Sequence, residues 1–372
     1  MKTLLYLFIL IGSFSCKKES TNVINTNAKI GLVKYATGFD IIDYKTHYKL
    51  ILKDPDSKTS SSIIFVKKAA KYAGKSNKQI FYAAISKIVV TSTTHIPMLE
   101  LLNKEESLVG FPNGKYISSK KTRKLIDNGQ VKELGKEQSI NTELLLDLHP
   151  ELVVGFSLST NKKMYANIQK AGIPVLINND WLEKTPLGRA EWIKFFGVLF
   201  GETEKANRIF NQIEREYLQA KQIALQANDK PKTLSGAMYQ GKWNLPAGES
   251  FGAKFLKDAN VNYIWGDSKG TGSLLLSLES VIDKGQDATI WLQPSFYTSY
   301  KQMKDANMHY VQFDAFQNKN IYNFTHNKGV TGGVIYYELA PIQPHIVLKD
   351  IIKAAHPELL PNYVPFYLEE LR

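Results

Sequence analysis

The segment INTELLLDLHPELVVG, residues 140–155, returns without a gap as LSLESVIDKGQDATIW, residues 276–291, at an offset of 136 positions. Both copies open with a residue that caps helices, Asn in one and Ser in the other, and carry a glutamate two positions later, Glu143 and Glu279. A side-chain oxygen caps a helix N-terminus, and a carboxylate in the first turn interacts favourably with the helix dipole. Each copy therefore predicts a capped helix that leads into a buried strand.

The wide spacing of this repeat indicates two similar lobes, because a solenoid would need several shorter copies. Short apolar stretches alternate with helical stretches in both halves, as at 87–91, 152–156 and 233–238. Such alternation favours a parallel α/β sheet. Before it, residues 29 to about 87 show short alternating apolar runs broken by turn residues, a pattern typical of β-strands. We therefore predict an α/β fold of two lobes with mainly parallel sheets and an extra β-rich N-terminal segment.

The middle of the chain predicts a long helix that links the two lobes. Residues 202–227 place apolar side chains three to four positions apart and end before Pro231. At 1.5 Å per residue, such a helix is about 35 to 40 Å long and can act as a rigid strut. The predicted organisation is a signal peptide at 1–15, a flexible tether at 16–28, an N-terminal lobe at 29–185, linking helices at 186–230 and a C-terminal lobe at 231–372.

The first residues are typical of an export signal. Lys2 precedes the apolar run 4–11, which is too short to span a bilayer as a finished helix. The run ends in SFSC, and Cys16 is the only cysteine of the chain. This arrangement resembles the lipobox of bacterial lipoproteins, although Ser13 stands where leucine is commoner. It predicts lipidation of Cys16 and a membrane anchor in the bacterial cell envelope, outside the cytoplasm; ordinary cleavage that leaves a free thiol is the alternative.

Composition narrows the possible functions. The formal net charge of +12 favours anionic ligands or an anionic membrane surface. No basic motif with interleaved aromatic residues appears, so a nucleic-acid partner is not expected. The seven histidines form no HExxH motif and no pair four residues apart. Since a metal site needs three or four convergent ligands, we expect neither a metal centre nor another cofactor.

One segment matches a catalytic motif. GESFG at 248–252 fits the G-x-S-x-G nucleophile elbow of α/β-hydrolases. Ser250 follows a Pro-Gly loop instead of a strand end, however, and fits better as a helix cap. No catalytic residue is predicted, and a hydrolase remains the rival function from another class.

Candidate ligand contacts follow from the strand ends. In open α/β sheets, ligands bind outside the carboxyl ends of the strands. Aromatic residues in such positions offer flat apolar surface with a polar edge. Arg189 can clamp an anionic group or cap a helix, and His95 can meet a ligand or a metal or serve the structure. The predicted ligand contacts are Trp243, Tyr239, Trp265, Trp181, Tyr116, Tyr297, Arg189 and His95.

Several motifs in a fixed order resemble the helix-linked class of ABC-transporter substrate-binding proteins, over about residues 86–360. They are NTELLLDLHPELVV at 141–154, PLGRAEW at 186–192, WNLPAG at 243–248, FLKDA at 255–259, LE at 278–279 and LKDIIKAAHPELLP at 348–361. The resemblance implies a monomer that catalyses no reaction and has an ABC permease and its ATPase as partners.

In that class, a glutamate on each lobe pairs with arginines of the permease. By resemblance these residues are Glu143 and Glu279 here. The class serves ferric siderophores, haem and cobalamin. We therefore predict a lipid-anchored carrier of an iron complex, a ferric siderophore first, with cobalamin or haem as the alternative ligand and a surface lipoprotein hydrolase as the alternative activity.

Overall fold

The computed structural model describes residues 31–54, 58–68, 70, 79–82, 84–156 and 161–372. The predicted signal peptide, the tether and the lipidation site Cys16 lie outside these residues. Among the helices of the described part, none combines the length and the apolar character needed to cross a bilayer.

The predicted β-rich N-terminal segment is a four-stranded sheet. Its order is β1-β2-β3-β4, antiparallel except for the last pair. The alternating apolar positions of the sequence account for it, since Leu50 and Leu52 of β2 are buried while their neighbours are more exposed. The strands are β1 (Phe39–Asp43), β2 (His47–Lys53), β3 (Ser60–Val66) and β4 (Ile80–Tyr82).

A second sheet, with the order β11-β10-β5-β6-β7, is parallel throughout. Its central strands are continuous apolar runs because helices cover the sheet. The strands are β5 (Ile88–Val90), β6 (Leu108–Phe111), β7 (Lys132–Glu133), β10 (Leu152–Gly155) and β11 (Val175–Ile177). A hairpin of β8 (Gly135–Lys136) and β9 (Ser139–Ile140) and the helices α1 (Ile96–Leu101), α2 (Lys120–Asp127), α3 (Thr142–Leu148) and α4 (Lys162–Lys170) connect them.

A third sheet, β15-β12-β17-β18-β19, is parallel except for its last strand. Its strands are β12 (Lys232–Ser235), β15 (Asn262–Tyr263), β17 (Ile290–Leu292), β18 (Ile321–Asn323) and β19 (Glu369–Glu370). Beside it lies a small antiparallel sheet of β13 (Ala237–Tyr239), β14 (Lys242–Pro246) and β16 (Ser273–Leu276). The helices are α8 (Phe251–Asp258), α9 (Leu278–Gly285), α10 (Tyr300–Ala306), α11 (Asp314–Gln317), α12 (Ile335–Leu339) and α13 (Pro344–Ala355).

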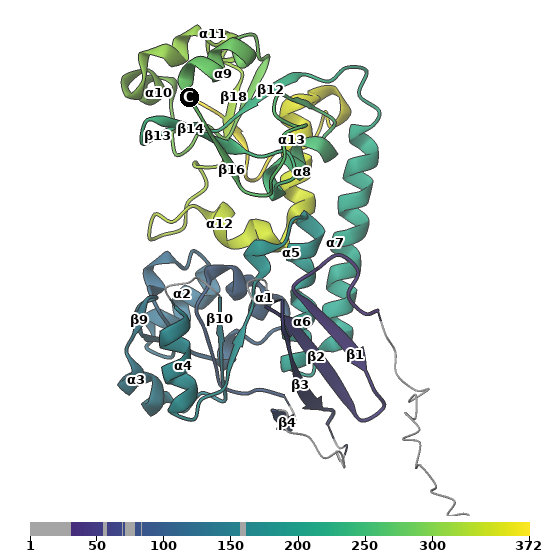
Figure 1. Cartoon of the computed structure of the whole chain (residues 1–372), viewed down its shortest axis with the longest axis vertical. Helices are drawn as coiled ribbons and strands as arrows, with labels where there is room; N and C mark the ends of the chain where they lie inside the picture. Colours follow the sequence, from purple (N-terminus) through teal and green to yellow (C-terminus); the bar gives the residue numbers. More distant parts are fainter. Residues whose placement is uncertain (1–30, 55–57, 69, 71–78, 83, 157–160) are drawn as a thin grey trace, which may run out of the picture.

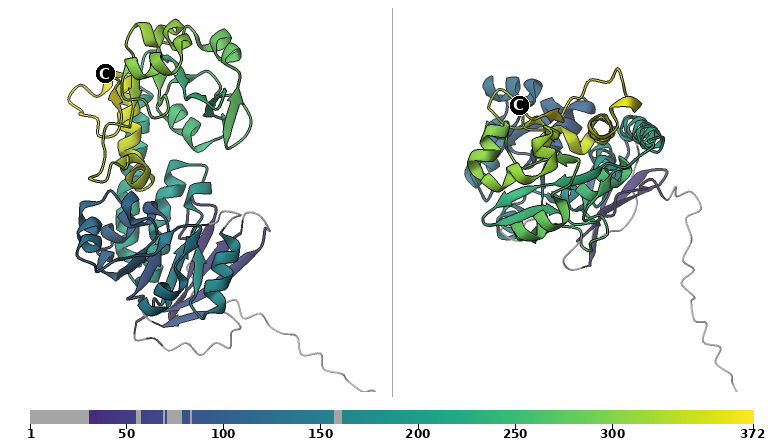
Figure 2. Two further views of the ribbon diagram at one scale, coloured as in Figure 1. Left: turned by 90° about the vertical axis from the view of Figure 1, so that its left-hand side faces the viewer. Right: turned by 90° about the horizontal axis from the view of Figure 1, so that it is seen from above.

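These sheets confirm the predicted α/β class with mainly parallel strands. The elements around the second sheet, with β1–β4, form one group, and those around the third sheet form another; we call them the N-terminal and the C-terminal lobe. Figure 1 shows one lobe above the other, and Figure 2 shows the same stacking from the side. Helix α12 lies between the lobes (Figure 1).

The sequence repeat occupies matching places in the two sheets. Helices α3 and α9 begin at Thr142 and Leu278, which are separated by the same 136 positions. The strand after α3 is β10, which lies between β5 and β11, and the strand after α9 is β17, which lies between β12 and β18. Each repeated helix therefore leads into an interior strand that lies next to the first strand of its sheet in chain order, β5 in one sheet and β12 in the other.

Three helices join the lobes: α5 (Pro186–Glu191), α6 (Ile193–Leu199) and α7 (Thr203–Ala224). Helix α7 has 22 residues, which makes it about 33 Å long. It runs alongside both lobes (Figure 1), packing on α6 at one end and on α13 at the other. The long helix predicted at 202–227 is thus present with slightly tighter bounds.

Candidate functional site

Two cavities lie at the carboxyl ends of the parallel strands, and both are lined by Tyr337 of α12. The cavity on the N-terminal lobe has a volume of about 280 Å³, and the one on the C-terminal lobe about 470 Å³. Strand ends are where ligands bind in open α/β sheets, and these volumes approach or fall within the range of small-molecule pockets. We call the two cavities together the interlobe cleft.

Residues from distant parts of the chain line this cleft. The cavity on the N-terminal lobe is lined by Thr91, Ser92, Thr93, Phe111, Tyr116, Glu137, Phe156, Gly333, Val334, Tyr337 and Glu338. The cavity on the C-terminal lobe is lined by Ser235, Gly236, Ala237, Tyr239, Asn244, Leu245, Pro246, Ser273, Gln293, Ser295, Phe296 and Tyr337.

Exposed aromatic rings dominate the cleft. Tyr116 is 56% exposed, Tyr239 63%, Phe296 65% and Tyr337 50%, which are high values for such large side chains. The rings of Phe296 and Tyr337 lie with their centroids 6.1 Å apart. Because aromatic faces bind flat apolar surfaces and tyrosine adds a hydroxyl, the cleft suits a large organic ligand.

Hydroxyl groups and a carboxylate form the polar part of the N-terminal cavity. The hydroxyls of Thr91 and Tyr165 are hydrogen-bonded at 3.1 Å. Glu137, from the turn between β8 and β9, is half-buried, and its Oε1 is buried without a hydrogen-bond partner among the residues that the structure describes. Burial raises the pKa of Glu137, and the neighbouring Asn161 side chain opposes that shift.

Glu338 of α12 ties the C-terminal segment to the N-terminal lobe. Its carboxylate, 2% exposed, accepts hydrogen bonds from the backbone N–H groups of Ser118 at 2.5 Å and Ser119 at 2.9 Å. Gly329 also packs closely against Ser118: a side chain at position 329 would place its Cβ 2.7 Å from Cβ of Ser118, which is too close. This contact holds α12 and Tyr337 against the cleft.

The same carboxylate makes stability depend on pH. Burial raises the pKa of Glu338 from 4.5 to about 7, the N–H donors of Ser118 and Ser119 lower it, and the charge of Glu100 raises it. A pKa above its unfolded value gives stability that is complete below about pH 4.5 and is lost as the pH rises through about 7.

We expect the free energy of unfolding of the wild type to fall by about 2–3 kcal/mol relative to Glu338→Gln between pH 5 and pH 8. Glutamine keeps the shape and cannot ionise, so the difference isolates this one group. Urea denaturation of both proteins across that pH range measures it. A difference that stays constant or grows in favour of the wild type as the pH rises would contradict this assignment.

The structure uses Arg189 mainly for internal contacts. Its guanidinium donates to the carbonyl oxygen of Trp181 at 2.8 Å and lies 3.5 Å from the ring centroid of Phe251 in α8. Arg189 thereby joins the two lobes, and it does not line either cavity of the cleft. Trp181, in the 3-10 helix Asp180–Leu182, is 41% exposed but likewise lines neither cavity.

Three predicted ligand contacts are core residues. Trp243 is 0% exposed, and its ring packs on Trp291 with centroids 5.2 Å apart. Trp265 is 8% exposed. His95 is 0% exposed, and burial lowers its pKa to about 3, so it is neutral and has no hydrogen-bond partner among the described residues. All three side chains are buried and line neither cavity of the cleft, so ligand contact at these positions stays a prediction that their burial does not favour.

The other residues predicted to bind ligand, to dock on a permease or to cap a helix lie in different parts of the structure. Tyr116 and Tyr239 line the cleft as expected. Tyr297 is half-buried and packs against Tyr310, while its neighbour Phe296 faces the cavity. Glu143 and Glu279, which are predicted to dock on a permease, are both exposed. Ser250 caps α8, with its Oγ accepting from the N–H of Ala253 at 3.2 Å.

Sequence reasoning missed Glu137, Tyr337 and Glu338, and at the end of β17 it selected Tyr297 instead of its neighbour Phe296. Phe296 directly precedes the predicted contact Tyr297, so the end of strand β17 correctly indicated this part of the cleft. Glu137 lies three residues before the first copy of the repeat, in the turn that leads to it. Tyr337 and Glu338 do not follow a strand, so the strand-end rule could not find them. The sequence signal that could have drawn attention to them is the pair of adjacent tyrosines, Tyr336 and Tyr337.

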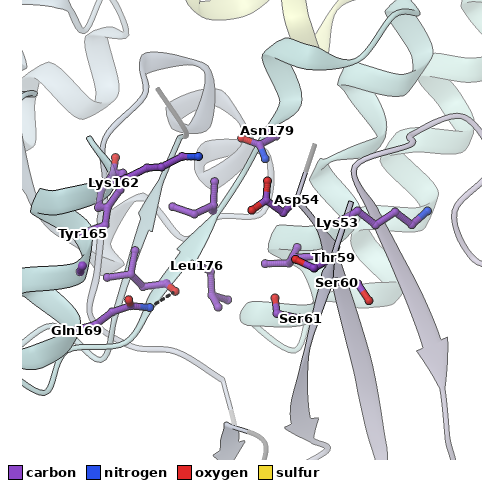
Figure 3. A pocket seen from close by; sticks show the side chains of 14 residues that line it. Lys53, Asp54, Thr59, Ser60, Ser61, Lys162, Tyr165, Gln169, Leu176 and Asn179 are labelled. Carbon is purple, nitrogen blue, oxygen red and sulfur yellow. Dashed lines mark hydrogen bonds between the residues drawn. The ribbon is translucent and has the colours of Figure 1, made fainter. Parts of the chain in front are cut away.

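A further groove runs along the edge strand β11, with a volume of about 400 Å³ (Figure 3). It is lined by Lys162, Tyr165 and Gln169 of α4 on one side and by Lys53 to Asp54 and Thr59 to Ser61 of the first sheet on the other. All of these residues belong to the N-terminal lobe. The cleft is the better candidate because it joins both lobes at their strand ends. Within the described residues, no group of three or more His, Cys, Asp and Glu side chains could hold a metal ion.

Comparisons with known proteins agree with this architecture. An uncharacterized lipoprotein of Methanocaldococcus jannaschii is 23% identical over 364 residues, which cover 92% of this chain and 84% of that protein. The CeuE protein of Helicobacter pylori, solved in complex with Ni-His, is similar with a TM-score of 0.56 and 19% identity over 84% of this chain and 90% of that one. An ABC transporter substrate-binding protein from Listeria monocytogenes has a TM-score of 0.54 and 18% identity over 73% and 99% of the two chains.

The family model for periplasmic binding proteins matches residues 88–327. That range holds both copies of the repeat, helix α7 and most of the residues that line the cleft. The chain therefore belongs to the periplasmic binding protein family.

Proposed function

We propose that the chain is the lipid-anchored substrate-binding protein of an ABC importer and that it captures an iron complex in the interlobe cleft. The observation that carries the proposal is the position of the aromatic rings. Tyr116 comes from the N-terminal lobe, Tyr239 and Phe296 come from the C-terminal lobe, and Tyr337 stands between them. A ligand held by all four would contact both lobes at once.

A ferric siderophore fits this surface better than a small ion does. Rings that are half or more exposed offer apolar contact area for an organic shell around the metal. A bare metal ion would instead need several convergent nitrogen or oxygen ligands. Cobalamin or haem would use the same rings and are the alternative ligands.

Delivery to the permease would use the two exposed glutamates. Asn141 Oδ1 accepts from the N–H of Leu144 at 3.0 Å, and Ser277 Oγ accepts from the N–H of Ser280 at 3.2 Å, so both helices begin at defined caps. The backbone N–H of Glu279 itself and the Ser277 hydroxyl lower the pKa of Glu279, which keeps it ionised. Two carboxylates on equivalent helices can pair with two cations and set register as well as affinity.

The contacts between the lobes support a small change of shape on ligand binding. Helix α7 packs against elements of both lobes, and Glu338 and Gly329 fasten the C-terminal segment to Ser118. A large hinge rotation would break the buried hydrogen bonds of Glu338 and leave its carboxylate without donors. Structures with and without ligand that differ by such a rotation would contradict this view.

A binding titration tests the proposal. Ferric siderophores, haem and cobalamin each absorb visible light in their own way, so mixing each with the purified protein identifies a bound ligand by its spectrum. We expect Tyr337→Ala to lower the affinity for the ligand by about 10- to 30-fold, because the ring lines both cavities at the centre of the contact. Tyr82→Ala is the matched control, since Tyr82 is 67% exposed on β4 and lines neither cavity.

If the wild type and Tyr337→Ala bound the ligand with equal affinity, the proposal that the ligand binds in the interlobe cleft would be wrong. Failure of every one of these compounds to bind would contradict the iron carrier and its alternatives together. A serine-reactive probe tests the rival hydrolase: Ser250 is 6% exposed and its Oγ caps α8, so we expect no labelling.

A further inference from the structure

The charge of the cleft differs in sign from the charge of the whole chain. The formal net charge is +12, with 47 Lys and Arg against 35 Asp and Glu. Of the described residues that line the two cavities, however, the acidic and basic ones are two glutamates, Glu137 and Glu338. No Lys, Arg or His is among these described lining residues. The basic surface therefore lies elsewhere on the molecule.

Of these two carboxyl groups, Glu137 is the one with a buried oxygen that has no hydrogen-bond partner among the described residues, although the Asn161 side chain also interacts with it. Glu338 is 2% exposed and accepts two backbone N–H groups. Glu137 is half-buried at the cavity wall, and its Oε1 accepts no hydrogen bond from the part of the chain that the structure describes. A buried carboxylate oxygen without a hydrogen-bond donor costs free energy. A ligand that donates a hydrogen bond to it therefore gains more binding free energy than the same hydrogen bond would give in water.

Two cations with contacts close to the cleft, Arg189 and Lys115, do not line its cavities. The guanidinium of Arg189 is occupied by the carbonyl of Trp181 and the ring of Phe251. Lys115 is exposed, and its Nζ lies 5.2 Å from the ring centroid of Tyr116, but Lys115 is not among the described residues that line the cavity. A ligand anion within the cleft would thus face Glu137 without a basic partner among the lining residues.

The aromatic rings favour the same sign of ligand. An ammonium group over the face of an aromatic ring is attracted by the electrons of the ring, and the gain grows when the site is shielded from water. Tyr116, Phe111 and Phe156 line the same cavity as Glu137. A cavity that combines a carboxylate with aromatic rings is suited to a primary amine or another cationic donor.

Resting on the proposed function, we propose that the ligand is a metal chelate without net negative charge, and that it presents a cationic or N–H donor group to Glu137. Chelates that carry several negative charges are rejected because each charge is repelled by Glu137 and has no cation to pair with in the cavity. Glu137 is then a specificity-determining residue.

Three ferric chelates of similar size test this charge preference by titration of the intact protein. The first is a tris-hydroxamate with a free primary amine and one positive charge, the second its N-acetylated analogue with no net charge, and the third a tris-catecholate with three negative charges. We expect the amine chelate to bind about 10-fold more tightly than its acetylated analogue. Its affinity should exceed that of the tris-catecholate by about 100-fold or more.

The variant Glu137→Gln isolates the carboxylate. It should remove the preference for the amine over the acetylated chelate and leave the affinity for the acetylated chelate within about twofold, because glutamine keeps the size of the side chain. Glu106→Gln is the matched control: Glu106 is an exposed carboxylate of the same lobe that lines neither cavity, and it should keep the full preference. Unchanged binding of the acetylated chelate also reports that the variant is folded.

Each outcome separates this inference from the proposed function. Tightest binding of the tris-catecholate, or of haem with its two propionates, would overturn the charge preference and leave the iron carrier standing. A preference for the amine chelate that survives Glu137→Gln would overturn the role of Glu137. Failure of all three chelates, haem and cobalamin to bind would overturn the proposed function, and this inference with it.

Discussion

Replacing both Glu143 and Glu279 by alanine is expected to reduce import to the level of a strain without the protein, while ligand affinity stays within about twofold of the wild type. The two side chains are exposed on the first turns of α3 and α9 and line neither cavity of the cleft. Loss of one carboxylate should already weaken docking, because the pair sets the register of the complex. Uptake of the labelled ligand by cells that carry each variant is the measurement.

The control for this experiment removes the same charge elsewhere. Glu106 in the N-terminal lobe and Glu358 in the C-terminal lobe are exposed, and neither lies on a repeated helix. Glu106→Ala with Glu358→Ala should leave uptake near the wild-type rate. Normal uptake by the Glu143→Ala, Glu279→Ala protein would show that the docking surface lies in another place.

Replacing Glu191 by alanine is expected to lower the free energy of unfolding by about 3–5 kcal/mol. The carboxylate of Glu191 is 0% exposed and accepts the backbone N–H groups of Lys34, Tyr35 and Ala36 at 2.6 to 3.0 Å and the ammonium of Lys194 at 2.7 Å. Alanine would leave a buried ammonium and three backbone donors without this acceptor. Urea denaturation followed by tryptophan fluorescence measures the loss.

An exposed glutamate provides the comparison. The side chain of Glu204, on the first turn of α7, is 94% exposed, so Glu204→Ala should change stability by no more than about 0.5 kcal/mol. A Glu191→Ala protein as stable as Glu204→Ala would mean that the N-terminal segment does not depend on this carboxylate.

Local patterns predicted the helices of the repeat well. The cap, the acidic first turn and the apolar spacing at 140–155 and 276–291 are short-range features, and α3 and α9 begin where those features place them. The class of the fold followed for the same reason, since alternating short strands and helices leave few arrangements other than a parallel α/β sheet.

The choice of cleft residues was less successful, because single positions decide which side of a strand a ring faces. Tyr239 and Trp243 lie close together on the hairpin of β13 and β14, where Tyr239 pairs with Lys242 and Trp243 pairs with Met238. Neighbouring pairs point to opposite faces of a strand. Tyr239 is therefore exposed in the cleft, whereas Trp243 packs among Trp291, Tyr310 and Phe313.

The sequence by itself determined the repeated capped helices, the parallel sheets and the long linking helix, because neighbouring residues set helix caps and strand periodicity. Only the tertiary structure decided the cleft and its charge. Glu338 binds Ser118 of the N-terminal lobe across 220 positions of the sequence, and Glu137, from a short turn, lines the same cavity as Tyr337 and Glu338. Which side chains face a shared cavity depends on how distant segments pack, and a net charge of +12 does not reveal that packing.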